Sequence, residues 1–127
     1  MPQLLIVRLA NDGAGTAAGV ADNDQALGMI VEGISKSKFW NETAIFVVEA
    51  WSQDASRRAP ALVISPWVKP GQTYTARYTQ ASVLRTIETI LGLRPLTVFD
   101  AAARPMFELF GDSPVAGAYV AASVQGR

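Results

Sequence analysis

Short apolar runs rich in branched residues alternate along the chain with segments of helical periodicity. The runs cover residues 4–7, 43–48 and 61–65, and each is continuous rather than interrupted by polar residues at every second position. Continuous apolar runs are typical of strands buried on both faces, and helices between strands favour parallel pairing. The sequence therefore predicts an α/β fold with a mostly parallel short sheet flanked by helices.

Two helices are predicted from apolar residues that recur every three or four positions. The first begins at about Asp22, and its apolar face is formed by Leu27, Ile30, Val31 and Ile34. The second follows Thr79, a residue type suited to helix capping, and stops at Gly92. Its expected buried stripe consists of Val83, Leu84, Ile87, Ile90 and Leu91. We expect residues 1–127 to form a single α/β domain, although the pattern over residues 107–127 is weak.

Histidine and cysteine are both absent from the 127 residues, which shortens the list of possible chemistries. A Ser-His-Asp triad, a thiol nucleophile and a zinc site built on imidazole or thiolate are all excluded. The 11 basic and 11 acidic side chains cancel, so no nucleic-acid partner is expected. No apolar stretch approaches the ~20 residues that span a bilayer. No signal peptide is recognised, so we expect a soluble protein without a membrane partner, of unassigned location.

The first candidate site is a pair of carboxylates, each placed after a predicted strand. Asp12 follows the first apolar run and Glu49 follows the second. Ligands of open α/β sheets bind outside the carboxyl ends of the strands. Two carboxylates in one cleft bind a hard cation such as Mg²⁺ or act as an acid–base pair. The alternative is that Asp12 makes a local turn and Glu49 is a solvated strand end.

Other polar and aromatic residues near the same predicted strand ends are candidates for substrate binding. They are Asn11, Trp51, Asp54, Arg57, Arg58 and Trp67. The two arginines could receive an anion through charge-assisted hydrogen bonds, or could be solvated loop residues. The two tryptophans could line an apolar pocket, cap the sheet or be buried in a subunit interface.

Several longer blocks of the sequence resemble a known family. The blocks are residues 9–13, 20–28, 37–49, 60–66 and 84–93. They are similar to the bacterial phosphoesterase family, which includes phospholipase C and acid phosphatase types within the alkaline phosphatase superfamily. The resemblance covers roughly residues 2–106 and matches only the carboxyl-terminal part of that family's catalytic domain. It implies a partial alkaline-phosphatase-like layer.

The ends of the first two predicted strands depart from the family pattern. In the family these strands typically end in Asn-Asp-His and in Val-Val-Glu-Asp-Asp. Gly13 stands in place of the histidine, and Ala50 and Trp51 stand in place of the two aspartates, while Glu49 is kept. Of the metal ligands that the resemblance implies, only Asp12 carries over, as a vestigial ligand.

The loop after the second predicted strand departs as well. It is shortened to residues 52–56, Arg57 occupies the position of a family histidine, and Arg58 matches the family arginine. The part of the family domain that carries the nucleophile has no counterpart in this sequence. A two-metal site needs several converging ligands, and one carboxylate cannot supply them. The resemblance thus implies that metal-assisted phosphoester hydrolysis is absent. No cofactor is expected, apart from weak Mg²⁺ binding.

Three functions remain as hypotheses. The favoured one is a self-associating scaffold, a homodimer that buries Trp51, Trp67 or the apolar cluster 106–110. The second is a metal-independent hydrolase in which Asp12 and Glu49 are the acid–base pair and an arginine stabilises negative charge. The third is a weak binder of phosphate or phosphoesters. No small-molecule ligand can be assigned from the sequence.

Overall fold

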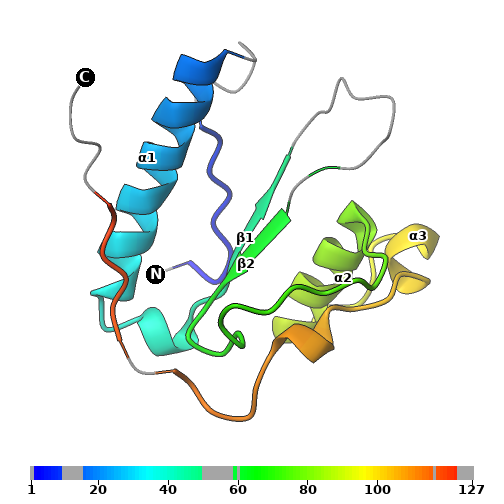
Figure 1. Ribbon diagram of the computed structural model, residues 1–127. Coiled ribbons are helices and arrows are strands. Elements are labelled where there is room, and N and C mark those ends of the chain that lie inside the picture. The colour runs from blue at the N-terminus through cyan, green and yellow to red at the C-terminus, as the bar shows by residue number, and fades with distance from the viewer. Residues whose placement is uncertain (1, 10–15, 50–58, 60, 116, 123–127) are drawn as a thin grey trace. The chain divides into compact units, whose positions relative to one another are not determined.

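The computed structural model describes residues 2–9, 16–49, 59, 61–115 and 117–122. Its elements are α1 (Ala17–Ser35), the 3-10 helix η1 (Trp40–Glu42), β1 (Ile45–Val48), β2 (Ala61–Ile64), α2 (Gln80–Ile90), α3 (Val98–Ala101) and the 3-10 helix η2 (Phe107–Leu109) (Figure 1). Helices and a small sheet thus form a mixed α/β structure. The chain divides into a first unit, Met1–Glu42 with Ala116–Arg127, and a second unit, Thr43–Val115. That residues 1–127 form one domain stays a prediction.

The helix α1 dominates the first unit and begins earlier than the sequence predicts. Its cap is Thr16, whose Oγ1 accepts a hydrogen bond from the N–H of Gly19 at 3.1 Å. The start predicted at Asp22 was too late because the first turn of α1 contributes little to the apolar periodicity. Capping and small helix-forming residues extend the helix without an apolar face.

An extended segment near the C-terminus, residues 117–122, runs along α1 (Figure 1). The N–H of Tyr119 donates to Oγ of Ser35 at 2.9 Å, and the N–H of Ala121 donates to Oε2 of Glu32 at 3.0 Å. The bonds to Lys36 and then to Ala121 lower the pKa of Glu32. The bond to the Glu32 carboxylate is charge-assisted, and the two bonds together hold residues 117–122 against α1.

The prediction of a buried strand over residues 4–7 is wrong. These residues form no strand, and their side chains are between 51% and 86% exposed. A continuous apolar run is stable as a strand only where a sheet neighbour and covering layers are present. Among the described residues, none pairs with this run.

The sheet of the second unit consists of β1 and β2, and the prediction of parallel strands is wrong for this pair. The strands are antiparallel, with Ile45 opposite Ile64 and Val48 opposite Ala61. Residues 49–60 connect the two strands. A crossover between parallel strands needs a dozen or more residues, so this connection has about the minimum length for one. The sequence of this connection is largely polar, and β2 lies alongside β1 in the opposite direction.

The core of the second unit lies between the sheet, α2 and η2. Val83, Met106 and Leu109 are buried at its centre. The partly buried residues around them are Phe46, Val63, Tyr74, Tyr78, Ile87 and Phe110. The apolar cluster 106–110 therefore contributes Met106 and Leu109 to this core, whereas the side chain of Phe107 is exposed.

The helix α2 begins and ends as predicted, but it buries different positions. Thr79 caps it through a reciprocal pair of bonds with Ser82, and Gly92 beyond its end has a φ of +68°. Leu84 and Ile90 of the expected stripe are exposed. The buried residues of α2 are Ser82, Val83, Thr86 and Glu88. Ser82 is paired with Thr79, and segments later in the chain supply hydrogen-bond partners for Thr86 and Glu88.

Within the described ranges, no helix combines the length and the apolar character needed to cross a membrane.

Candidate functional site

Most of the site residues predicted from the sequence lie outside the described residues. Those outside are Asn11, Asp12, Trp51, Asp54, Arg57 and Arg58. Glu49 and Trp67 are described, and both belong to the second unit. Their proposed roles in catalysis and substrate binding stay predictions.

The antiparallel sheet places Glu49 and Trp67 at opposite ends of the strand pair. Glu49 follows β1 at the end of the sheet where β2 begins, and its carbonyl oxygen accepts a hydrogen bond from Nε2 of Gln80 at 2.9 Å. Trp67 follows β2 at the other end, where its N–H donates to Oγ of Ser65 and its carbonyl oxygen accepts from Gly111. The structure does not bring these two residues together.

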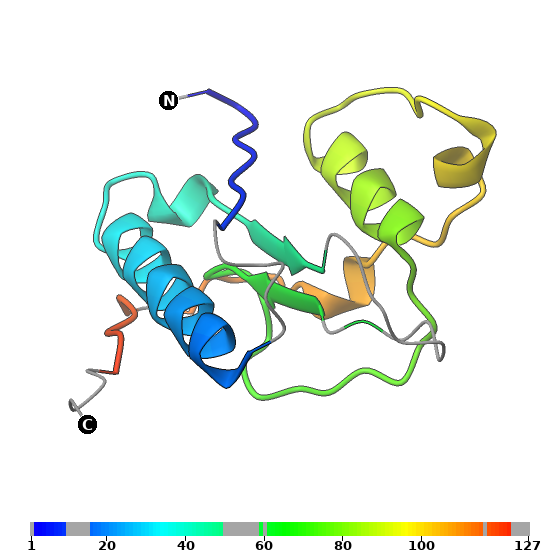
Figure 2. The ribbon, with the colours of Figure 1, turned by 90° about the horizontal axis from the view of Figure 1, so that it is seen from above.

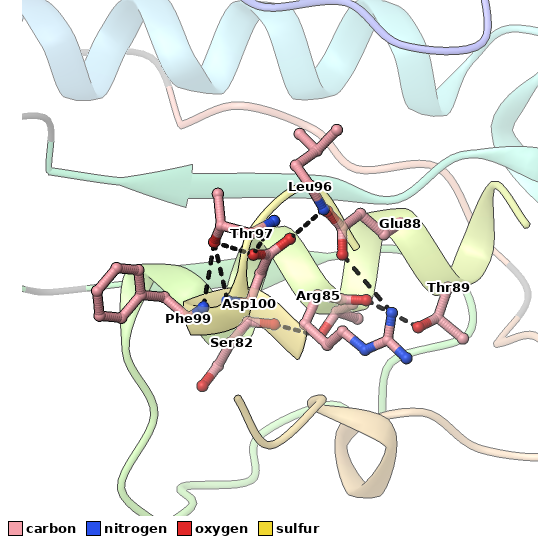
Figure 3. A network of polar contacts seen from close by, with 9 residues as sticks. Ser82, Arg85, Glu88, Thr89, Leu96, Thr97, Phe99 and Asp100 are labelled. Carbon is pink, nitrogen blue, oxygen red and sulfur yellow. Dashed lines mark hydrogen bonds and ion pairs between the residues drawn. The ribbon is translucent and has the colours of Figure 1, made fainter. Parts of the chain in front are cut away.

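A buried pair of carboxyl groups is the most unusual polar feature of the described residues. Glu88 comes from α2 and Asp100 from α3, and their side chains are only 2% and 1% exposed. Residues 91–97 arch from the end of α2 to the start of α3 (Figure 2). Both carboxyl groups point into this arch (Figure 3). We call Glu88 and Asp100 the acid pair.

The position of Asp100 follows from the local sequence at the start of α3. Thr97 caps this short helix, and its Oγ1 accepts hydrogen bonds from the N–H groups of Phe99 and Asp100. In return, Oδ1 of Asp100 accepts from the N–H of Thr97 at 2.8 Å and from the Thr97 hydroxyl. A reciprocal capping box of this kind orients the carboxylate toward the residues that precede the helix.

The two acids meet at the N–H of Leu96. This group donates to Oδ2 of Asp100 at 2.7 Å and to Oε1 of Glu88 at 3.2 Å (Figure 3). Glu88 also lies 3.7 Å from Nη1 of Arg85, a long ion pair on the same helix. Its Oε2 atom is buried and has no hydrogen-bond partner among the described residues.

The surroundings move the pKa values of the acid pair in opposite directions. Burial, followed by a hydrogen bond with Asp100, raises the pKa of Glu88 above its ordinary 4.5. Hydrogen bonds from Thr97 hold the pKa of Asp100 far below its ordinary 3.8, and those with Glu88 and Leu96 add to the effect. Opposite shifts in neighbouring carboxyl groups are typical of acid–base sites. Here both groups are buried, so the pair can hold a proton but cannot touch a substrate.

The sequence did not predict the acid pair, although a local motif marks the position of Asp100. Thr97 and Asp100 have the spacing of a capping box, which marks the start of a helix. Nothing local marks Glu88, because a glutamate on an amphipathic helix is usually solvated. Its burial depends on a backbone N–H eight residues further along the chain.

In the ranges 2–9, 16–49, 59, 61–115 and 117–122, no group of three or more acidic side chains is placed to hold a metal ion. Asp12, the vestigial ligand implied by the resemblance, lies outside these ranges.

Comparison with known proteins identifies the class of protein that this chain resembles. The model of the phosphoesterase family matches residues 51–94, a segment that includes β2 and α2. The resemblance is confirmed over this segment, which is consistent with a partial phosphoesterase domain. Glu88 lies within the match and Asp100 lies beyond it. No match was found among curated proteins.

Proposed function

We propose that the chain is a phosphoesterase-related domain that lacks the family's metal-assisted hydrolysis and acts as a self-associating scaffold. The family match over residues 51–94 supports the relationship. The absence of histidine and cysteine from the whole sequence supports the loss of the metal site, because carboxylates alone are poor ligands for zinc.

The observation that carries the scaffold proposal is an exposed apolar segment that runs from the arch into the start of α3. Within residues 93–99, Leu93, Leu96, Val98 and Phe99 are each between 55% and 79% exposed. The backbone of this segment is fixed by the acid pair and by Thr97, so its apolar side chains cannot fold inward without breaking buried hydrogen bonds. Clustered exposed apolar side chains on a fixed backbone are typical of interaction surfaces.

The sheet gives independent support for association. Within the described ranges, β1 and β2 pair only with each other, so the outer edge of each strand carries no ladder. Val48 and Leu62 are also exposed on this pair. Two-stranded sheets are marginal in isolation, and unpaired edges are templates for pairing with another chain.

The expected result is a concentration-dependent dimer in solution. Sedimentation velocity at micromolar concentrations should show a species of twice the chain's 13.6 kDa mass. Phe99→Ser together with Leu96→Ser should shift the equilibrium toward monomer, because both side chains lie in the exposed segment. Val120→Ser, at an exposed position outside that segment, serves as the control and should leave the dimer intact. A wild-type chain that stays monomeric over this range would overturn the scaffold proposal.

The proposed loss of hydrolysis predicts no turnover of simple phosphoesters. Chromogenic phosphomonoester and phosphodiester substrates should react no faster with the protein than without it, in the presence of Zn²⁺, Mg²⁺ or Mn²⁺. Measurable turnover would contradict this part of the proposal. Turnover that is also lost in Glu49→Gln would favour the alternative hydrolase that uses Asp12 and Glu49.

A further inference from the structure

The contacts of the acid pair are difficult to reconcile with two ionised carboxylates. Oε1 of Glu88 and Oδ2 of Asp100 both accept from the single N–H of Leu96, at 3.2 and 2.7 Å. Their oxygens are therefore neighbours in a site with almost no access to water. Two like charges at such separations repel strongly when solvent does not screen them, and one carboxyl group keeps its proton.

The hydrogen bonds indicate which of the two acids is ionised. Asp100 accepts from the N–H of Leu96, the N–H of Thr97 and the Thr97 hydroxyl, a set of donors that favours the charged form. Glu88 accepts only the longer bond from Leu96, and its Oε2 has no hydrogen-bond partner in the described part of the chain. The proton therefore belongs on Glu88.

We propose that Glu88 and Asp100 share one proton, held by Glu88 and donated to Asp100, which makes the anchoring of residues 93–99 depend on pH. While the proton is present, the arch is held from α2 by a neutral acid and from α3 by a carboxylate. When the proton leaves, a second charge appears inside the site. The repulsion then acts directly on the contact that joins α2 to α3.

The charged groups that face Glu88 are few. Asp100 faces it from α3, and Arg85 faces it from its own helix at 3.7 Å. The guanidinium of Arg85 is partly exposed, and the ion pair is longer than a hydrogen bond, so it offsets only part of the cost of a second buried charge. Ionisation of Glu88 is therefore unfavourable in the folded chain.

The sign of the pH effect follows from the two pKa shifts. The raised pKa of Glu88 means that its contribution to stability is complete below 4.5 and is lost as the pH rises through its folded value. The lowered pKa of Asp100 means that its contribution is complete above 3.8 and is lost on acidification. The acid pair thus holds the arch best in mild acid and more weakly as the pH rises.

A direct test follows the carboxyl groups of the wild-type chain by carbon-13 NMR as the pH is varied. We expect the Glu88 carboxyl to titrate above 4.5, and the Asp100 carboxyl to stay ionised well below 3.8. Above the Glu88 transition, the Leu96 amide should lose protection from hydrogen exchange relative to amides at the start of α2. A Glu88 carboxyl that titrates at or below 4.5 would overturn the proposal, as would unchanged protection of Leu96.

A matched pair of variants tests the same proposal through stability. Glu88→Gln cannot ionise, and its amide can donate to Asp100 as the protonated acid does, so its anchoring of the arch should not vary with pH. As the pH rises from 4.5 to about 8, the wild type should become progressively less stable relative to Glu88→Gln, measured as the free energy of unfolding. Glu42→Gln, at an exposed position, should show no such trend. Parallel pH profiles for the wild type and Glu88→Gln would refute the shared proton.

The shared proton and self-association both concern residues 93–99, but their tests can fail separately. The NMR titration reports on the proton whether the chain is a monomer or a dimer. Failure of the dimer experiment would leave the acid pair unaffected, and the reverse also holds.

Discussion

Met106→Ala should lower the free energy of unfolding of the second unit by about 2–5 kcal/mol. Met106 is only 5% exposed and packs with Val83 and Leu109 at the centre of the core. Alanine would remove three heavy atoms of apolar contact and leave a cavity that a core of this size cannot readily close. The measurement is chemical denaturation followed by far-ultraviolet circular dichroism and tryptophan fluorescence, with Trp67 reporting on the second unit.

The control for this prediction is Met29→Ala. Met29 lies in α1 and is exposed, so its truncation removes little buried surface, and alanine favours the helix. Its effect should stay within about 0.5 kcal/mol of the wild type. Equal losses in the two variants would show that Met106 is not part of a packed core.

Thr86→Val should cost about 1–3 kcal/mol, although the two side chains have nearly the same shape. Thr86 is fully buried, and its Oγ1 donates to the carbonyl oxygen of Ser82 at 2.7 Å and accepts from the N–H of Met106 at 2.9 Å. Valine would leave the Met106 N–H buried without a partner. The loss is measured by the same denaturation experiment.

Thr89 provides a matched control on the same helix. Its hydroxyl donates to the carbonyl oxygen of Arg85 at 2.8 Å, the same bond to the residue four positions earlier. Thr89 is exposed, however, and its hydroxyl accepts from no later N–H among the described residues. Thr89→Val should therefore change stability by no more than about 0.5 kcal/mol. A loss at position 89 as large as that at position 86 would mean that the tertiary bond to Met106 contributes nothing.

Features that depend on neighbouring residues were predictable from the sequence. The cap of α2 at Thr79 and its end before Gly92 depend on side chains and backbone angles within one turn. The strand over residues 61–65 is confirmed as β2, and that over 43–48 as β1, because branched apolar residues dominate both. The positions of these elements could therefore be predicted without knowing which other segments pack against them.

Features that depend on distant residues were not predictable. The direction of β2 relative to β1 cannot be read from either strand alone, and the apolar run 4–7 has no sheet neighbour among the described residues. The burial of Thr86 and Glu88 depends on the N–H groups of Met106 and Leu96, which lie 20 and 8 residues further along the chain. Helical periodicity alone places apolar residues at buried positions and cannot anticipate such polar partners.

The bonds between residues 117–122 and α1 have a consequence for the order of folding during synthesis. Ser35 and Glu32 find their partners at Tyr119 and Ala121 only after 84 and 89 further residues have been added. The second unit, Thr43–Val115, is continuous in sequence and does not include residues 117–122. We therefore expect the second unit to fold without residues 117–122, whereas α1 gains its bonds from Ser35 and Glu32 only once that segment has been made.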